Sequence, residues 1–129
     1  MRLWHYKLIP LLPRKQLLGQ WRELNSIYKK QDRHILINYI YDYPKYDLYS
    51  YSILVIEELK NRNYKHNLNN FYLYFNNISY DKKIIPFINK MNNRYLIQCL
   101  YNLQEKYDCG GINDIEWKKI ELVYMNLLL

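Results

Sequence analysis

Residues 14–28 read RKQLLGQWRELNSIY and directly follow a proline. Apolar side chains recur along this stretch every three or four residues, at Leu17, Leu18, Trp21, Leu24 and Tyr28. A helix of about 3.6 residues per turn places such positions on one face, and proline suits the first helical turn. The pattern therefore predicts an amphipathic helix over 14–28. Its charged residues fall mainly off the apolar stripe: Arg14, Lys15, Arg22 and Glu23.

Three further stretches have the same periodicity. One opens near Pro44 and runs to about Asn61, another covers 92–107, and the last covers 114–128. Gly110 and Gly111 follow the second of these and are typical of a helix end. The stripes consist of Leu48, Tyr51, Ser52, Val55, Ile56 and Leu59, then Tyr95, Leu96, Cys99, Leu100, Leu103 and Tyr107, then Trp117, Ile120, Val123, Tyr124 and Leu127.

Two segments lack this regularity. Residues 61–90 are rich in asparagine and contain Pro86, which favours turns, so we predict no motif there. Residues 34–41 are β-branched in places and are expected to form a short strand or an extended linker. Because no internal repeat or domain linker occurs in 129 residues, the sequence predicts one compact all-α domain, 1–129, of about four helices joined by irregular segments.

The chain is basic, and its excess charge is concentrated at the start. The formal net charge is +7, and residues 1–33 hold eight Lys and Arg against two acidic residues, so six of the seven net charges lie there. Clustered cations attract polyanions through long-range electrostatics and counterion release. The expected partner is a nucleic acid or an anionic membrane, and a solvated basic surface without a partner is the alternative.

Several classes of protein are excluded by what the sequence lacks. The apolar runs 8–12 and 52–56 fall far short of the roughly 20 residues that span a bilayer, and prolines interrupt the apolar segment near the N-terminus, which argues against a signal peptide. Cys99 and Cys109 form no C-x-x-C pair, and the three histidines share no helical spacing, so we expect no metal and no cofactor. Free thiols fit a reducing compartment, so we expect a cytoplasmic or nucleoid-associated protein, of cellular or viral origin.

The candidate chemistry lies in the first predicted helix, because no P-loop, G-x-S-x-G, dinucleotide fingerprint or metal-binding helix motif is present. Glu23 is a lone carboxylate beside Arg22 in a basic neighbourhood, a helical span from the chain's own α-amino group. An α-amine has a reference pKa of about 7.7–8.0, so part of it is neutral at neutral pH. A neutral amine is a usable nucleophile for imine formation.

These residues carry a resemblance to a known family. The run 17–24, LLGQWREL, resembles the catalytic helix of the bacteriophage-type pyrimidine-dimer DNA glycosylases, which also have AP-lyase activity. Residues 53–62, ILVIEELKNR, resemble the second long helix of that family, and residues 102–106, NLQEK, part of a later one. The opening MRLWH, with Leu8-Ile9-Pro10 and Pro13-Arg14, is similar to a bacterial branch of the family.

The resemblance implies a mechanism. In that family the N-terminal α-amine attacks C1′ of the damaged nucleoside and expels the base, leaving an imine that acts as an electron sink. A glutamate matching Glu23 abstracts the C2′ proton, so that β-elimination breaks the strand, and an arginine matching Arg22 holds phosphate. The implied catalytic residues are therefore Glu23, Arg22, and Met1 or Arg2 as the bearer of the amine.

The chain also departs from the phage-type pattern. That pattern has a small residue after the initiator methionine, whereas residue 2 here is Arg, so the nucleophile is the amine of Met1 or, if a protease trims the chain, that of Arg2. Ser26 stands where a second phosphate-binding arginine is expected. Gln16 replaces a histidine, and Asn102 replaces a basic residue.

The implied partner is double-stranded DNA with damaged pyrimidines or abasic sites, bound by a monomer and without a membrane. Reaching a sugar inside a duplex requires a kinked helix and an extruded nucleotide, at a cost of a few kcal/mol. Trp4 and Trp21 are candidates for base stacking, although the apolar stripe favours core packing for Trp21. A non-catalytic helical nucleic-acid-binding domain and a small interaction protein are the alternatives. The residues expected to contact DNA are Arg14, Lys15, Arg22, Lys29, Lys30, Arg33 and His34.

Overall fold

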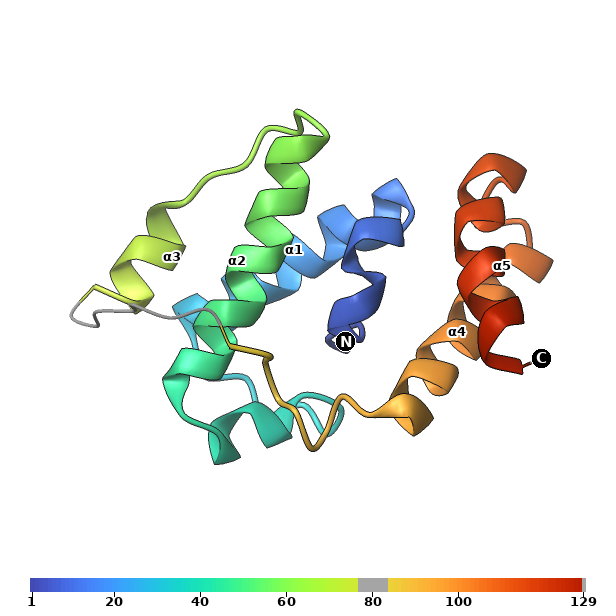
Figure 1. The fold of residues 1–129 in the computed structure, drawn as a ribbon. Coiled ribbons are helices and arrows are strands. Elements are labelled where there is room, and N and C mark those ends of the chain that lie inside the picture. Colours follow the sequence, from blue (N-terminus) through green and yellow to red (C-terminus); the bar gives the residue numbers. More distant parts are fainter. Residues whose placement is uncertain (77–83, 129) are drawn as a thin grey trace.

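The computed structural model describes residues 1–76 and 84–128. Within these ranges the protein is helical and contains no strand, which confirms the predicted all-α class (Figure 1). Four long helices are present: α1 (Arg14–Lys29), α2 (Lys45–Asn61), α4 (Asn93–Asp108) and α5 (Asp114–Leu128). Three shorter elements accompany them: the 3-10 helices η1 (Tyr6–Leu11) and η2 (Asn38–Asp42), and α3 (Asn69–Tyr74).

The ends of the long helices follow from local chemistry. Pro13 and Pro44 immediately precede α1 and α2, where proline's missing N–H breaks no helical bond. The side chain of Asn92 accepts a hydrogen bond from the Tyr95 N–H at 3.0 Å and so caps α4. After α4, Gly110 adopts a φ of 82°, which glycine tolerates without strain. The four predicted helices and the predicted stop are thus confirmed, each boundary within one residue.

The prediction of a strand or extended linker over 34–41 is wrong. Ile37 N donates to His34 O at 2.9 Å to form a turn, and η2 begins at Asn38. Ile37 and Ile40, three residues apart, are both buried in the core. A 3-10 helix places such a pair on one face, whereas a strand would point them in opposite directions.

The segment 61–90 is less irregular than its asparagines suggest. It contains α3, where Phe71 and the following Phe75 lie one helical turn apart and are both buried. Phe71 and Phe75 pack against Tyr28 of α1, with ring centroids 6.0 and 5.7 Å away. Residues 77–83 of this segment lie outside the described residues.

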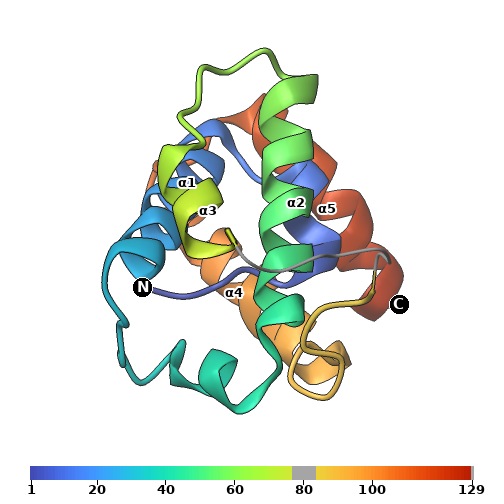
Figure 2. The same ribbon diagram turned by 90° about the vertical axis from the view of Figure 1, so that its left-hand side faces the viewer.

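The N-terminal segment forms the centre of the fold. η1 contacts both α2 and α5, while α1 packs on α2 and α3, and α4 packs on α5. Figures 1 and 2 show the segment running between α1 and α2 on one side and α4 and α5 on the other. Leu3, Leu8 and Ile9 are buried along it, while the terminus emerges at the edge of the molecule beside α1. The N-terminal segment is therefore held between the α1–α2 pair and the α4–α5 pair.

The side chain of Arg62, at the end of α2, joins α2 to η1 through hydrogen bonds. Its guanidinium donates to Leu12 O at 2.8 Å and to Pro10 O at 3.1 Å, and its Nε donates to Glu58 at 2.7 Å. The two carbonyls lie at the end of η1, where a helix leaves acceptors unpaired. This contact joins residues about fifty positions apart and steadies the segment that leads from the terminus to α1.

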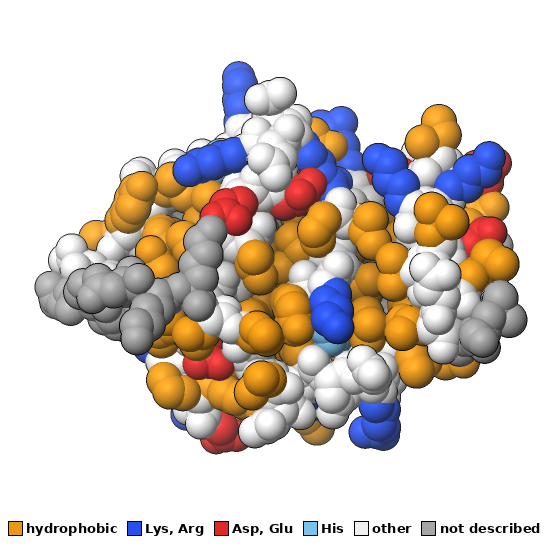
Figure 3. Space-filling view, in the orientation of Figure 1, with side chains coloured by type: hydrophobic (Ala, Val, Ile, Leu, Met, Phe, Trp, Pro, Cys, Tyr) orange, Lys and Arg blue, Asp and Glu red, His pale blue; other side chains and the backbone are white. Residues whose placement is uncertain are grey.

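On the face drawn in Figure 3, hydrophobic side chains occupy much of the middle, and Lys and Arg gather along the upper edge near α2 and α5. None of the described helices combines the length and the apolarity needed to cross a membrane. Other Lys and Arg side chains lie near the middle of the face drawn in Figure 3 and at its lower edge.

Candidate active site

A pocket of about 250 Å³ opens where the N-terminal segment crosses α1. One face of α1 supplies part of its wall, because Gln16, Gly19, Gln20 and Glu23 follow the helical spacing of three, four and seven residues. Among the described residues, Glu23 is the sole acidic one in the lining. The remaining lining residues are Met1, Arg2 and Trp4 from the N-terminal segment, Lys15 from α1 and Lys106 from α4.

Glu23 is half-buried in this pocket, and burial raises the pKa of its carboxyl above the ordinary value. The N-terminal ammonium opposes that rise, and it is the strongest of the charges that act on Glu23. The backbone N–H of Arg2 and the guanidinium groups of Arg22 and Arg2 also oppose the rise in the pKa of Glu23, but burial outweighs them. A carboxylate whose pKa lies nearer neutrality is a better general base than an exposed glutamate.

Gln20 connects the terminus to Glu23. Its amide nitrogen donates to Arg2 O and to Glu23 Oε2, both at 3.1 Å. Its amide oxygen accepts from the Trp4 N–H at 2.8 Å and from the Tyr51 hydroxyl at 2.8 Å. The side chain is buried and has its hydrogen-bonding capacity satisfied, so it holds the first residues of the chain and the carboxylate in one arrangement.

Two buried tyrosines reinforce this hold from the other helices. The Tyr51 hydroxyl of α2 lies 2.6 Å from Trp4 O and 2.8 Å from Gln20 Oε1, so these two acceptors share its one proton, and the Tyr95 hydroxyl of α4 donates to Leu3 O. Burial raises the pKa of both hydroxyls, so they remain protonated donors. Side chains from α1, α2 and α4 therefore all converge on residues 2–4.

His5 anchors the end of the same segment. Its Nδ1 accepts from the Lys7 N–H at 3.1 Å, so in the neutral ring the proton is on Nε2, which donates to Met91 O at 2.8 Å. Burial lowers the pKa of His5 to about 4, so the ring is neutral at physiological pH. The neutral state is the one that makes both bonds.

Arg22 is not among the residues that line the pocket, but it lies beside one of them, Gly19. The Arg22 side chain is exposed, and its guanidinium lies over Gly19, with Nη2 3.6 Å from where a Cβ at that position would be. Ser26, which stands in place of an expected arginine, donates to the backbone oxygen of Arg22 at 3.2 Å and therefore does not extend toward a ligand. One arginine thus lies beside this part of the pocket where the phage-type pattern has two.

Gln16 also differs from the phage-type pattern, and its side chain lines the pocket. Its amide oxygen is buried and has no hydrogen-bond partner in the described part of the chain. Buried acceptors are normally paired, so this oxygen is an exception among the described residues.

The other expected DNA contacts spread along α1. Lys15 lines the pocket, whereas the guanidinium of Arg14 lies 5.3 Å from the Tyr64 ring centroid. Lys29 and Lys30 are exposed at the opposite end of α1, roughly 24 Å away at about 1.5 Å per residue. These cations therefore lie at the two ends of α1, and Lys15 alone among them lines the pocket.

Arg33 and His34 lie beyond that end of α1, and both are exposed. Arg33 donates to Asn38 Oδ1 at 3.1 Å, and its guanidinium lies 4.8 Å from the Tyr41 ring centroid. The expected stacking residues, by contrast, are buried. Trp21 is core, as its stripe position favours, and Trp4 packs in the core with one edge at the pocket.

Sequence reasoning missed four residues of this site: Gln20, Tyr51, Tyr95 and Lys106. Gln20 carried a detectable signal, because it is a polar residue one helical turn before Glu23 and next to Trp21 of the apolar stripe. The two tyrosines were assigned to apolar stripes, where their hydroxyls have no sequence signature. Among the described residues, no group of three or more His, Cys, Asp or Glu side chains could hold a metal ion.

An all-α protein with a basic pocket at its N-terminus is consistent with a DNA-directed enzyme, and a family comparison supports this class. Residues 1–71, more than half of the chain, match the model of the pyrimidine dimer DNA glycosylase family. The protein therefore belongs to that family, which confirms the resemblance and gives it a repair function of the pyrimidine dimer glycosylase kind on damaged DNA. No curated protein and no solved structure matches the chain significantly.

Proposed function

We propose that the protein excises damaged pyrimidines from double-stranded DNA and then cleaves the strand at the resulting abasic site, with its N-terminal α-amine as nucleophile and Glu23 as the acid/base. The observation that carries this proposal is the shared basic pocket of the terminus and Glu23, in which the ammonium is the strongest charge acting on the carboxylate. Membership of the family supports the glycosylase step.

The first step is a displacement at C1′ of the damaged nucleoside. The neutral amine donates its electron pair to C1′, and the electron pair of the glycosidic bond leaves with the base, which takes up a proton. The nitrogen then loses a proton, its electron pair forms the C1′=N bond as the C1′–O4′ bond breaks, and O4′ takes up a proton, which leaves a protonated imine between the terminus and C1′. The pocket supplies three cations for the negative charge of the flanking phosphates, Arg2, Lys15 and Lys106, and Arg22 lies next to it beside Gly19.

The second step uses the imine as an electron sink. Glu23 takes the proton from C2′, which the imine makes acidic. The electron pair of that C–H bond forms the C2′=C3′ double bond, and the C3′–O bond breaks with the phosphate as leaving group. Water then hydrolyses the imine and frees the amine. Burial raises the pKa of Glu23, which strengthens it as a base for this proton.

Borohydride trapping tests this proposal. The protein is incubated with a duplex that holds a cyclobutane dimer or an abasic site, and borohydride reduces any imine to a stable amine link. We expect a covalent protein–DNA adduct with both substrates. A shift in the gel mobility of the DNA without an adduct would instead support a non-catalytic binding domain. The absence of both the shift and the adduct would support an interaction protein.

The variant Glu23→Gln separates binding from chemistry. We expect strand cleavage to fall at least 100-fold with DNA affinity nearly unchanged, because the amide keeps the shape of the side chain but cannot accept the C2′ proton. Glu105→Gln, at an exposed carboxylate on α4, is the matched control and should cleave like the wild type. An unchanged cleavage rate in Glu23→Gln would remove Glu23 from the mechanism.

A further inference from the structure

The turn between α1 and η2 presents two adjacent apolar side chains to solvent. Ile35 is 87% exposed and Leu36 is 44% exposed. Hydrogen bonds hold the turn in shape: His34 N donates to Asp32 Oδ1 at 2.9 Å, and Leu36 N donates to His34 Nδ1 at 3.2 Å. The next residue, Ile37, is fully buried and anchors the turn in the core. We refer to Ile35 and Leu36 as the apolar tip.

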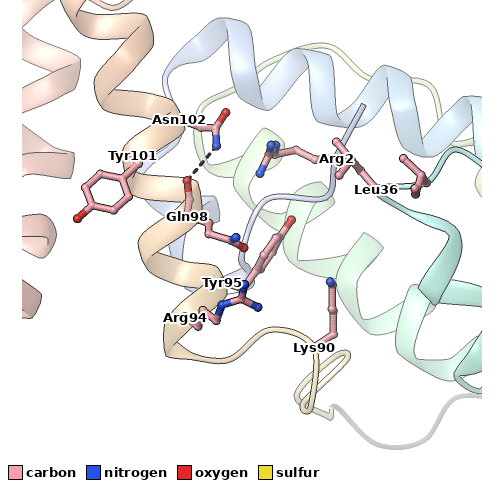
Figure 4. A pocket seen from close by; sticks show the side chains of 9 residues that line it. Arg2, Leu36, Lys90, Arg94, Tyr95, Gln98, Tyr101 and Asn102 are labelled. Carbon is pink, nitrogen blue, oxygen red and sulfur yellow. Dashed lines mark hydrogen bonds between the residues drawn. The ribbon is translucent and has the colours of Figure 1, made fainter.

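The apolar tip lines a second basic pocket of about 380 Å³. Figure 4 shows Arg2 extending across this pocket between Leu36 and α4, with Lys90 rising beside it. Arg94 supplies a third cation, and none of the lining residues in the described part of the chain is acidic. Because Arg2 lines both pockets, the apolar tip lies on the same side of the molecule as Glu23 and the terminus.

Exposure alone does not distinguish the apolar tip, because single exposed hydrophobic residues are common. Leu73 and Ile115 are each 76% exposed, yet neither lines either of the two basic pockets. The apolar tip differs in that two apolar residues are adjacent, are fixed by a hydrogen-bonded turn, and border a pocket with three cations. If DNA binds here with its phosphates on these cations, the apolar tip lies next to the stacked bases.

We propose that the apolar tip is a wedge that enters the base stack of bound DNA next to the nucleotide handled in the catalytic pocket. Inserted Ile and Leu side chains unstack a base step and kink a duplex, which allows a nucleotide to leave the stack. Arg2, Lys90 and Arg94 hold the phosphates of the kinked strand. The position of the wedge relative to the lesion rests on the proposed function.

Fluorescence of 2-aminopurine tests the wedge without any covalent step. The duplex carries a tetrahydrofuran abasic analogue, which has no aldehyde and forms no imine, with 2-aminopurine opposite it. At saturating protein we expect the fluorescence to rise at least threefold as the base unstacks. Ile35→Ser/Leu36→Ser should abolish the rise, whereas Ile35→Met/Leu36→Met and the matched control Ile115→Ser should retain it.

The outcomes separate the wedge from the proposed function. An equal rise in the double serine variant, an equal loss in Ile115→Ser, or no rise or no binding with the wild type would overturn the wedge. The serine variant should still be trapped by borohydride on a single-stranded abasic oligonucleotide, where nothing has to be unstacked. If the wild type gives the fluorescence rise but no trapped adduct on any substrate, the wedge stands and the catalytic proposal falls.

Discussion

Gln20 is the residue on which the geometry of the candidate site most depends. It contacts Arg2, Trp4, Glu23 and Tyr51 with one amide group, so the terminus and the carboxylate share a single support. Glutamine suits this role because it both donates and accepts. A residue that can do only one of these leaves a buried partner unsatisfied.

Gln20→Glu tests this role, because the carboxylate accepts from Trp4 and Tyr51 but has no proton for Arg2 O or Glu23. We expect the free energy of unfolding to fall by about 1–3 kcal/mol. The added negative charge should raise the pKa of Glu23, so the acidic limb of the pH profile of strand cleavage should move to higher pH. Gln31→Glu, the same change at an exposed position, should alter neither property. An unmoved profile in Gln20→Glu would contradict the coupling.

Acetylation of the α-amine tests whether the terminus lies beside Glu23. The ammonium lowers the pKa of Glu23, so its removal should raise that pKa. Titration of the Glu23 side-chain carboxyl by carbon-13 NMR, in free and acetylated protein, measures the change, with the other carboxylates as internal references. An unchanged titration of Glu23 would show that the α-amine does not lie near the Glu23 carboxylate, and it would remove the basis for the mechanism.

At the scale of elements, the four long helices were predictable because each carries an apolar stripe and a local start or stop signal. Asn92 and Gly110 act through their own backbone neighbours, so the sequence contains all that is needed to place them. The short elements were not predictable. α3 forms where Phe71 packs on Tyr28 of α1, and η2 forms where Ile37 is buried in the core, although the local sequences favour turns.

The N-terminal segment makes an element-scale prediction about acid stability. His5 has a pKa of about 4 in the folded protein, against 6.5 for the free side chain, so below about pH 6.5 the unfolded chain binds a proton that the folded chain does not. Stability should therefore fall as the pH is lowered from 7 toward 4. Between pH 7 and 5 this group should contribute about 2 kcal/mol.

Urea unfolding of the wild type and His5→Gln at pH 7 and pH 5 measures this contribution. Glutamine can still donate to Met91 O but does not titrate, so the variant should lose about 2 kcal/mol less stability between the two pH values. His34→Gln, which removes a histidine from the surface, is the control and should retain the wild-type difference. Equal differences in all three proteins would show that His5 does not govern the acid sensitivity.

At the scale of the whole molecule, the cations around the two pockets come from more of the chain than the N-terminal quarter that the charge count singles out. The sequence concentrates charge in residues 1–33, and that segment does supply Arg2 and Lys15 to the site. The fold adds Lys90, Arg94 and Lys106 from the region around α4, some ninety residues later. Such convergence depends on how α4 packs across the N-terminal segment, and no local pattern encodes it.

The same packing leaves more than one amine in the pocket that holds Glu23. The α-amine, Lys15 and Lys106 all border it, and a lysine side chain can also form an imine. The geometry favours the α-amine, because Gln20 and Tyr51 fix its segment while both lysines are exposed.

Mass spectrometry of the trapped complex tests the central claim most directly. The protein is trapped with borohydride on an abasic duplex, digested with protease, and the peptide that carries the sugar remnant is sequenced. We predict a single modified site, the α-amine of residue 1, or of Arg2 if the mature chain is trimmed. Modification of the Lys15 or Lys106 side chain, with an unmodified terminus, would contradict the account.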